Sequence, residues 1–223
     1  VGSVPVQRNH RTNLYGQLLT SDVEINVEIL PDYDEGDKYG AIDGQVYVRV
    51  DDATEFNDAF VDNNVDIIIL NNDVVVEGPL TRASADPTLT VSSGKVLTID
   101  LNGKTLNAVS AETGKNYNLF DVRGTLTVKN GTVEIEHVGT NMGWGSSTNV
   151  FNVTAGGVLN IADAEISNLG GSDMAFVAHL NNWGEVTLNV ENSVLTSTYV
   201  AVRVFNSGND MNNVTIKKTT LKG

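Results

Sequence analysis

The feature that most constrains the fold of this chain is an apolar triplet that recurs along its C-terminal part. In each copy, two apolar residues flank one other residue, and a third follows five positions after the second. The copies are Ile99, Leu101 and Leu106; Leu126, Val128 and Val133; Leu159, Ile161 and Ile166; Leu188, Val190 and Leu195; and Val214, Ile216 and Leu221. Their second members are 27, 33, 29 and 26 residues apart. Repeats of this length are typical of solenoids, and an earlier copy is expected within 67–76.

A second apolar strand lies between successive copies of the triplet. Its pairs are Phe120 with Val122, Phe151 with Val153, Phe176 with Ala178, and Val202 with Val204. Gly and Asn separate these runs as turn residues, because both tolerate positive φ. Each repeat therefore supplies about three short strands. We predict an all-β chain in which residues 46–223 form a right-handed, single-stranded parallel β-helix.

The residues before the repeats have a different organisation. Residues 23–29 alternate between apolar and polar residues, which predicts one extra strand. Residues 32–45 have the composition of an acidic linker. We therefore divide the chain into residues 1–31, a linker at 32–45 and the β-helix at 46–223.

A capping helix is expected at the start of the β-helix. Asp52 stands three residues before Glu55, as in a capping box, and Phe56, Ala59 and Phe60 share one helical face. These residues predict a helix near 52–63 that covers the N-terminal end of the core.

Charge and composition exclude several kinds of partner. The formal net charge of −14 argues against nucleic acid, because each phosphate contact requires Lys or Arg. The chain has no cysteine, which excludes disulfides, thiolate metal sites and a cysteine nucleophile. It also lacks the run of about 18 apolar residues that a membrane span requires, and no signal peptide begins at Val1. If the protein is exported, we expect its targeting segment to have been removed.

Two segments of the repeat region, Lys95–Leu106 and Gly124–Val133, resemble the coils of β-helices in the pectate-lyase-like superfamily. Residues 46–76 are similar to the N-terminal cap of such proteins. The resemblance implies the fold for most of residues 46–223. It does not imply one activity, because the superfamily includes lyases, hydrolases, adhesins and phage spikes.

A separate resemblance lies upstream, where Val4–Thr20 is similar to the last strands of fimbrillin-like domains in surface proteins of Bacteroidota. It implies that residues 1–31 are the tail of a β-sandwich whose earlier strands are missing here. It also implies a secreted or outer-membrane, surface-exposed location. The last residues, Thr219–Gly223, follow a repeat strand without a polar cap. We therefore expect both ends to be cut from a longer chain.

The outward positions of the second strand carry the side chains best suited to binding. With its phenylalanines inward, Asp121, Arg123, His179 and Arg203 face outward, and arginines there could hold the carboxylate of an acidic sugar. The alternative is that Asp121 and Arg123 form an exposed pair worth well under about 1 kcal/mol. Trp144 and Trp183 lie in turns, where indole rings either stack on sugars or cover the end of the core.

Catalytic and metal-binding patterns are weak. Resemblance to a lyase of the pectate type would require a cluster of three or more acidic calcium ligands beside an Arg or Lys. The outward column supplies Asp121 as its one acid. Glu134, Glu136 and Glu165 are the alternative acids for an inverting hydrolase. No cofactor is predicted. Calcium is the one metal left open, at an acidic run that we interpret as a solvated linker: Asp32, Asp34, Glu35 and Asp37.

These observations predict a non-catalytic binding or adhesion module at a cell surface, with a polysaccharide or surface glycan as its partner. One alternative is a polysaccharide lyase or glycoside hydrolase that acts from the outer side of the β-helix. The other is a structural stalk that presents a further domain.

Overall fold

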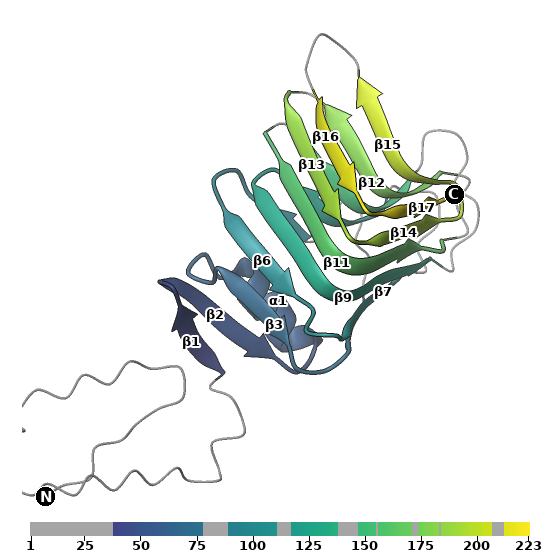
Figure 1. Ribbon diagram of the computed structural model, residues 1–223. Helices are drawn as coiled ribbons and strands as arrows, with labels where there is room; N and C mark the ends of the chain where they lie inside the picture. Colours follow the sequence, from purple (N-terminus) through teal and green to yellow (C-terminus); the bar gives the residue numbers. More distant parts are fainter. Residues whose placement is uncertain are drawn as a thin grey trace, which may run out of the picture.

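The computed structural model describes residues 38–77, 89–110, 117–137, 147–154, 156–170, 174–182, 184–206 and 212–223. In this part of the chain the fold is a parallel β-solenoid with a twelve-stranded large sheet and a five-stranded small sheet (Figure 1). One helix, α1 (Ala53–Val61), follows the first two strands. The predicted fold class is confirmed. The extra strand expected at 23–29 lies outside the described residues.

A typical coil contributes one strand to the small sheet and one to each half of the large sheet. The small sheet comprises β5 (Leu89–Val91), β8 (Tyr117–Val122), β10 (Thr148–Val153), β12 (Ala175–Asn182) and β15 (Val200–Asn206). The first half of the large sheet comprises β2 (Gln45–Val50), β3 (Ile67–Leu70), β6 (Val96–Asp100), the beginnings of β9 (Thr125–His137) and β11 (Val158–Asn168), β13 (Val186–Glu191) and β16 (Asn212–Lys217). The second half comprises β4 (Val74–Glu77), β7 (Thr105–Ser110), the ends of β9 and β11, β14 (Val194–Ser197) and β17 (Thr220–Lys222).

The bend between the two halves is made by residues with a left-handed backbone. Asn130 in β9 has φ 61°, Asp163 in β11 has φ 52°, and Asn192 between β13 and β14 has φ 50°. Asn and Asp adopt this conformation at lower cost than most residues, because their short side chains form local hydrogen bonds. Asn130 donates to the Asp100 carboxylate at 3.1 Å, and Asn192 donates to Asp163. Successive coils therefore turn in the same way.

Four of the five predicted triplets stack in the expected register. Leu126 pairs with Leu159, which pairs with Leu188, and Leu188 pairs with Val214. The first triplet is offset: the partners of Leu126 and Val128 are Leu97 and Ile99, not Ile99 and Leu101. The reason is the Asn102–Gly103 turn, because the paired positions Ile99 and Leu106 are two residues further apart than Val128 and Val133.

One predicted pair of the small sheet is also offset by two residues. Phe120 and Phe151 pair as expected, but the next strand places Ala178 at this level, followed by Val202. Phe176 instead pairs with Asn149. The prediction was wrong here because Phe176 is the aromatic residue of its strand and was aligned with the other phenylalanines.

Helix α1 covers the N-terminal end of the core as predicted. The backbone N–H of Glu55 donates to the Asp52 carboxylate at 2.9 Å, and the Glu55 carboxylate accepts from the Asp51 N–H at 3.0 Å. The residues that the helix buries are Phe56, Ala59 and Phe60. At its C-terminal end, Lys95 Nζ donates to the carbonyls of Phe60 and Asp62 at 2.7 and 3.1 Å. Burial lowers the pKa of Lys95. A cation at this end also interacts favourably with the helix dipole.

Part of the segment assigned to the linker forms a strand. β1 (Tyr39–Ile42) pairs antiparallel with β2. The turn between them is Asp43–Gly44, with φ 51° and 84°, which is suited to a two-residue hairpin. Tyr47 packs on Gly40, where a Cβ atom would lie 2.3 Å from the ring.

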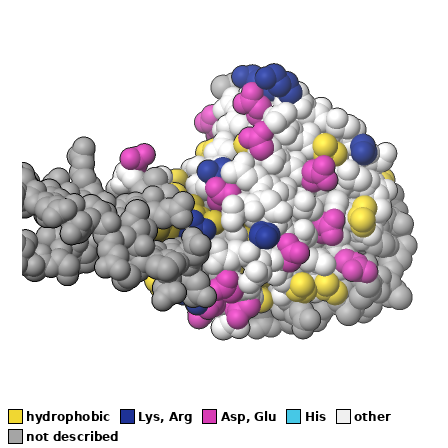
Figure 2. Space-filling view, turned by 60° about the horizontal axis from the view of Figure 1, so that its bottom comes forward, with side chains coloured by type: hydrophobic (Ala, Val, Ile, Leu, Met, Phe, Trp, Pro, Cys, Tyr) yellow, Lys and Arg dark blue, Asp and Glu magenta, His cyan; other side chains and the backbone are white. Residues whose placement is uncertain are grey.

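The core is a continuous column of buried apolar side chains between the sheets. Its aromatic part links the helix to the small sheet: the ring centroid of Phe120 is 5.9 Å from that of Phe60 and 5.4 Å from that of Phe151. On the face that Figure 2 shows, acidic and basic side chains are scattered over the surface, with broad areas that are neither charged nor hydrophobic. Charge on that face is therefore spread out.

We expect Phe120→Ala to lower the free energy of unfolding by about 3–5 kcal/mol, because it removes a buried ring that contacts two others. The control is Val96→Ala, at a position 54% exposed, which should change it by less than about 0.5 kcal/mol. Urea denaturation followed by circular dichroism measures both. Equal losses in the two variants would contradict this account of the core.

Candidate functional site

The small sheet brings three of the predicted site residues to one level. Asp121 in β8 pairs with Asn152 in β10, which pairs with His179 in β12, and His179 pairs with Arg203 in β15. Because Phe120 and Phe151 face the core, the next residues on these strands face outward. This row of four, from Asp121 to Arg203, is called the outer column here. Asn152, an outward position in the sequence, belongs to it as well.

Asp121 is held by hydrogen bonds on both carboxylate oxygens. Arg123 donates to Oδ2 from Nε and Nη2, at 3.0 and 2.7 Å, and Asn152 Nδ2 donates to Oδ1 at 2.7 Å. Asp121 is buried, whereas the Arg123 side chain is 58% exposed. The pair is therefore not the fully exposed pair of the alternative interpretation. Asp121 therefore holds one edge of the Arg123 guanidinium, while more than half of the arginine side chain is exposed.

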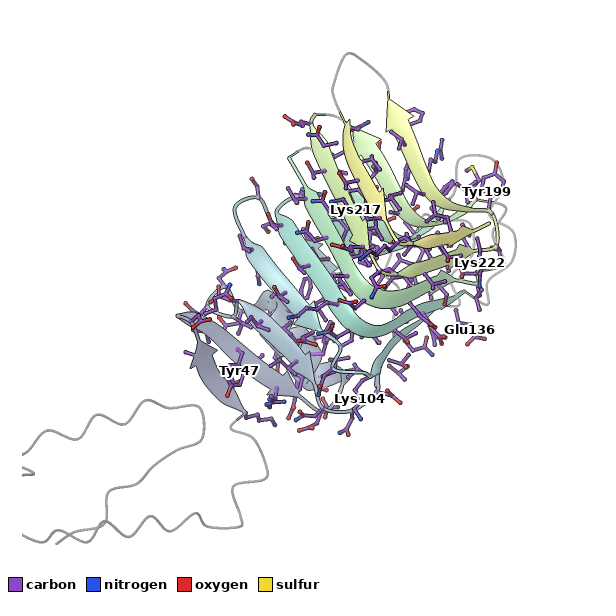
Figure 3. All side chains as sticks on the ribbon, viewed as in Figure 1. Tyr47, Lys104, Glu136, Tyr199, Lys217 and Lys222 are labelled. Atoms are coloured by element: carbon purple, nitrogen blue, oxygen red, sulfur yellow. The ribbon has the colours of Figure 1, made fainter. Side chains whose placement is uncertain are left out.

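Aromatic rings surround the other end of the outer column. The guanidinium carbon of Arg203 lies 5.1 Å from the ring centroid of Phe176 and 5.3 Å from that of Phe205. Phe176 also contacts His179, at 5.3 Å between centroids, and the edge of Tyr199, at 5.8 Å. Tyr199 is 51% exposed and Phe205 is 43% exposed. This end combines a cation held against rings with two rings that reach solvent (Tyr199 is labelled in Figure 3).

Sequence reasoning missed the roles of Phe176 and Tyr199. Phe176 is predicted to face the core and is buried as expected, but its ring also contacts the outward side chains of His179 and Arg203. Tyr199 immediately precedes β15, so the signal available in the sequence was an aromatic residue close to each end of that strand. Trp144 and Trp183 lie outside the described residues.

Arg123 and Arg203 are too far apart to bind the same carboxylate. Arg123 follows β8 and Arg203 belongs to β15, and two strands of the sheet lie between them. At about 4.8 Å per strand, they are separated by roughly 14 Å. A ligand that meets both arginines must therefore be a chain with several acidic groups.

The acids considered for hydrolysis lie on another sheet. Glu134, Glu136 and Glu165 occupy exposed positions on the second half of the large sheet, and Figure 3 labels Glu136 near the end of β9. Glu165 pairs with Thr132, and Glu134 pairs with Ser167, so these two acids are diagonal neighbours on adjacent strands. They do not face the outer column.

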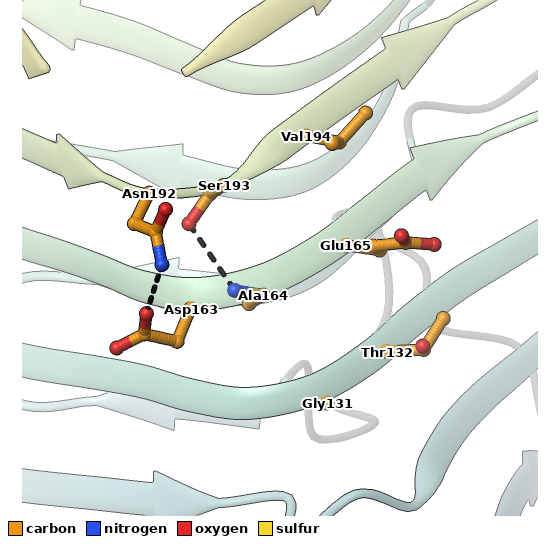
Figure 4. Close-up of a pocket in the computed structure, with 8 residues that line it drawn as sticks. All are labelled: Gly131, Thr132, Asp163, Ala164, Glu165, Asn192, Ser193 and Val194. Atoms are coloured by element: carbon orange, nitrogen blue, oxygen red, sulfur yellow. Dashed lines mark hydrogen bonds between the residues drawn. The ribbon is translucent and has the colours of Figure 1, made fainter. Parts of the chain in front are cut away.

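A groove of about 380 Å³ lies at the bend beside Glu165 (Figure 4). It is lined by Gly131, Thr132, Asp163, Ala164, Glu165, Asn192, Ser193 and Val194. The Ala164 N–H donates to Ser193 Oγ at 3.2 Å, and Asp163 accepts from Asn192. Only one of the three acids proposed for hydrolysis, Glu165, lines it.

Within the described residues, no group of three or more His, Cys, Asp or Glu side chains could hold a metal ion. The acidic run left open for calcium, Asp32, Asp34, Glu35 and Asp37, lies outside the described residues.

Comparison with known proteins identifies one family match. A family model described as "Family of unknown function (DUF6562)" matches residues 1–64, which include β1, β2 and α1. The searches of the curated proteins and of the solved structures found no match.

We expect Asn152→Asp to destabilise the fold at neutral pH by about 1–3 kcal/mol, because it replaces a donor to Asp121 by a second buried carboxylate. The repulsion raises the folded-state pKa of the carboxylate pair, so the deficit should shrink as the pH falls and one group is protonated. Urea denaturation at pH 7 and pH 4 tests this.

The matched control is Asn189→Asp, an exposed amide on the first half of the large sheet. It should cost less than about 1 kcal/mol, with little dependence on pH. A deficit in Asn152→Asp that is the same at both pH values would contradict the proposed contact between the carboxylates.

Proposed function

We propose that this chain is a non-catalytic binding or adhesion module of a cell surface, and that the outer side of its small sheet binds an acidic polysaccharide. The observation that carries the proposal is the outer column. Its Asp121 anchors the exposed Arg123 beside one end, and at the other end Arg203 lies against the rings of Phe176 and Phe205.

The chemistry of the column suits a chain of acidic sugars. A guanidinium presents N–H donors in a planar fork that matches a carboxylate, and stacking on Phe176 and Phe205 limits the orientations of Arg203. The exposed rings of Tyr199 and Phe205 offer apolar surface to the faces of sugar rings. The separation of roughly 14 Å between the arginines fits acidic groups on different sugar units.

Asp121 supports a binding role better than a catalytic one. Both of its oxygens accept hydrogen bonds from Arg123 and Asn152, so its geometry is that of an anchor. The rest of the protein is acidic, and the attraction to an acidic polymer is therefore local to the arginines. Salt should weaken such binding strongly, because partly exposed charges are screened.

The surface location rests on the two resemblances in the sequence. Val4–Thr20 is similar to fimbrillin-like domains of Bacteroidota surface proteins, and the repeats resemble the pectate-lyase-like superfamily. Both kinds of protein work on or outside the cell. A secreted or outer-membrane location is part of the proposal.

We expect Arg203→Gln to weaken binding to an acidic polysaccharide at least tenfold, because it removes the fork and the charge. Arg203→Lys keeps the charge alone and should show a smaller loss. The assay is native affinity electrophoresis in gels that contain polygalacturonate, alginate or hyaluronan, at low and high salt. Arg49→Gln is the matched control, since Arg49 lies 5.8 Å from the ring centroid of Tyr47 on another sheet.

No retardation by any acidic polymer, or equal effects of Arg203→Gln and Arg49→Gln, would refute the binding proposal. The same mixtures distinguish a lyase from a binding module. Release of unsaturated products, followed by ultraviolet absorbance, would show turnover instead.

A further inference from the structure

A second surface, independent of the small sheet, lies on the outer side of the first half of the large sheet. Two neighbouring rows of outward side chains cross β6, β9, β11, β13 and β16 in register. The first row consists of Val96, Thr125, Val158, Thr187 and Asn213, and the second of Thr98, Thr127, Asn160, Asn189 and Thr215. These ten positions are named the Thr/Asn surface.

None of the ten side chains is charged. The other half of the same sheet does not share this property: the equivalent outward positions there include Glu134, Glu165 and Lys222. A third row on the first half, next to the Thr/Asn surface, contains Lys129 and Glu191. Charged residues prefer exposed positions. This chain has 42 charged residues, of which 14 are basic and 28 are acidic. Their absence from these ten positions therefore sets this surface apart.

The second row is also ordered by hydrogen bonds between coils. Asn160 Nδ2 donates to Thr127 Oγ1 at 3.2 Å, and Asn189 Nδ2 donates to Asn160 Oδ1 at 2.9 Å. Each amide retains a second N–H donor and further acceptor capacity. The second row is thus a fixed set of groups that both donate and accept hydrogen bonds. In the first row Thr125, Thr187 and Asn213 supply such groups, and Asn213 Nδ2 donates to the Glu185 carboxylate at 2.7 Å.

The spacing of this set follows from the fold. Neighbouring members of a row are about 4.8 Å apart, and the two rows are about 6.6 Å apart, since they differ by two residues along each strand. Five strands span roughly 19 Å. A ligand that matches this set must be extended, regular and uncharged, with polar groups along its length.

We infer that the Thr/Asn surface binds a neutral polysaccharide chain. Sugar hydroxyls donate and accept hydrogen bonds, as the Asn amides and Thr hydroxyls do. An acidic polymer would find no cation among the ten side chains, and an apolar partner would bury their amides without hydrogen bonds. The ligand class and the residues differ from those of the outer column, so each site can fail without the other.

The test is affinity electrophoresis in gels that contain hydroxyethylcellulose, mixed-linkage β-glucan or galactomannan. Thr187→Glu should weaken retardation at least fivefold, because it puts a charge into the first row. Thr196→Glu is the matched control: Thr196 is also partly buried and faces outward, but from the second half of the sheet. Arg203→Gln should retain full binding to the neutral polymers.

Should Thr187→Glu fail to fold by circular dichroism, Asn189→Glu at an exposed position carries the same test. Lack of retardation by every neutral polymer, or equal losses in Thr187→Glu and Thr196→Glu, would overturn the inference. Sedimentation velocity provides a further check. A dimer that Thr187→Glu dissociates would show that the surface binds a second copy of the chain and would also overturn it.

Discussion

The structure depends on one constraint, the parallel in-register stacking of equivalent strand positions from coil to coil. Leu126, Leu159 and Leu188 occupy the same inward position on successive strands and are fully buried. Strands of four to six residues, such as β3 and β10, have no stability alone, so each coil is ordered by its neighbours. The same register that aligns the core also aligns the side chains on the outside. Both candidate binding surfaces are therefore products of the stacking that stabilises the fold.

The two surfaces use this regularity in different ways. On the small sheet the outward row is chemically varied, and its members form specific pairs: Asp121 with Arg123 and Asn152, and Arg203 with Phe176. On the Thr/Asn surface of the large sheet, the two rows consist of Thr, Asn and Val side chains and carry no charge. The first arrangement suits ligands with discrete acidic groups, and the second suits a repeating neutral chain. A solenoid can carry both surfaces because the inward side chains of its sheets pack into one core, whereas the outward residues differ between the sheets.

The sequence predicted the fold because inward positions recur with a fixed apolar offset. It predicted the stacking order less well, and the physical reason is the two-residue period of a strand. A shift by two residues keeps every inward residue inward, so Leu97 and Ile99 could not be told from Ile99 and Leu101, nor Phe176 from Ala178. The sequence still placed Asp121 and Arg203 at the same level of the sheet, because their strands were aligned correctly. The contact between Arg203 and Phe176 could not be foreseen, because a residue predicted to face the core is not expected to contact an outward side chain.

The offset at the Asn102–Gly103 turn has a wider consequence. Two additional residues are accommodated there while Ile99 still pairs with Val128 and Leu106 still pairs with Val133. The bend between the halves of the large sheet thus absorbs a change in length without displacing any inward ladder. This corner is therefore a site where two additional residues leave the packing of the neighbouring strands intact. At this corner the number of residues in a coil therefore changes, while the pairing of the strands on either side of it does not.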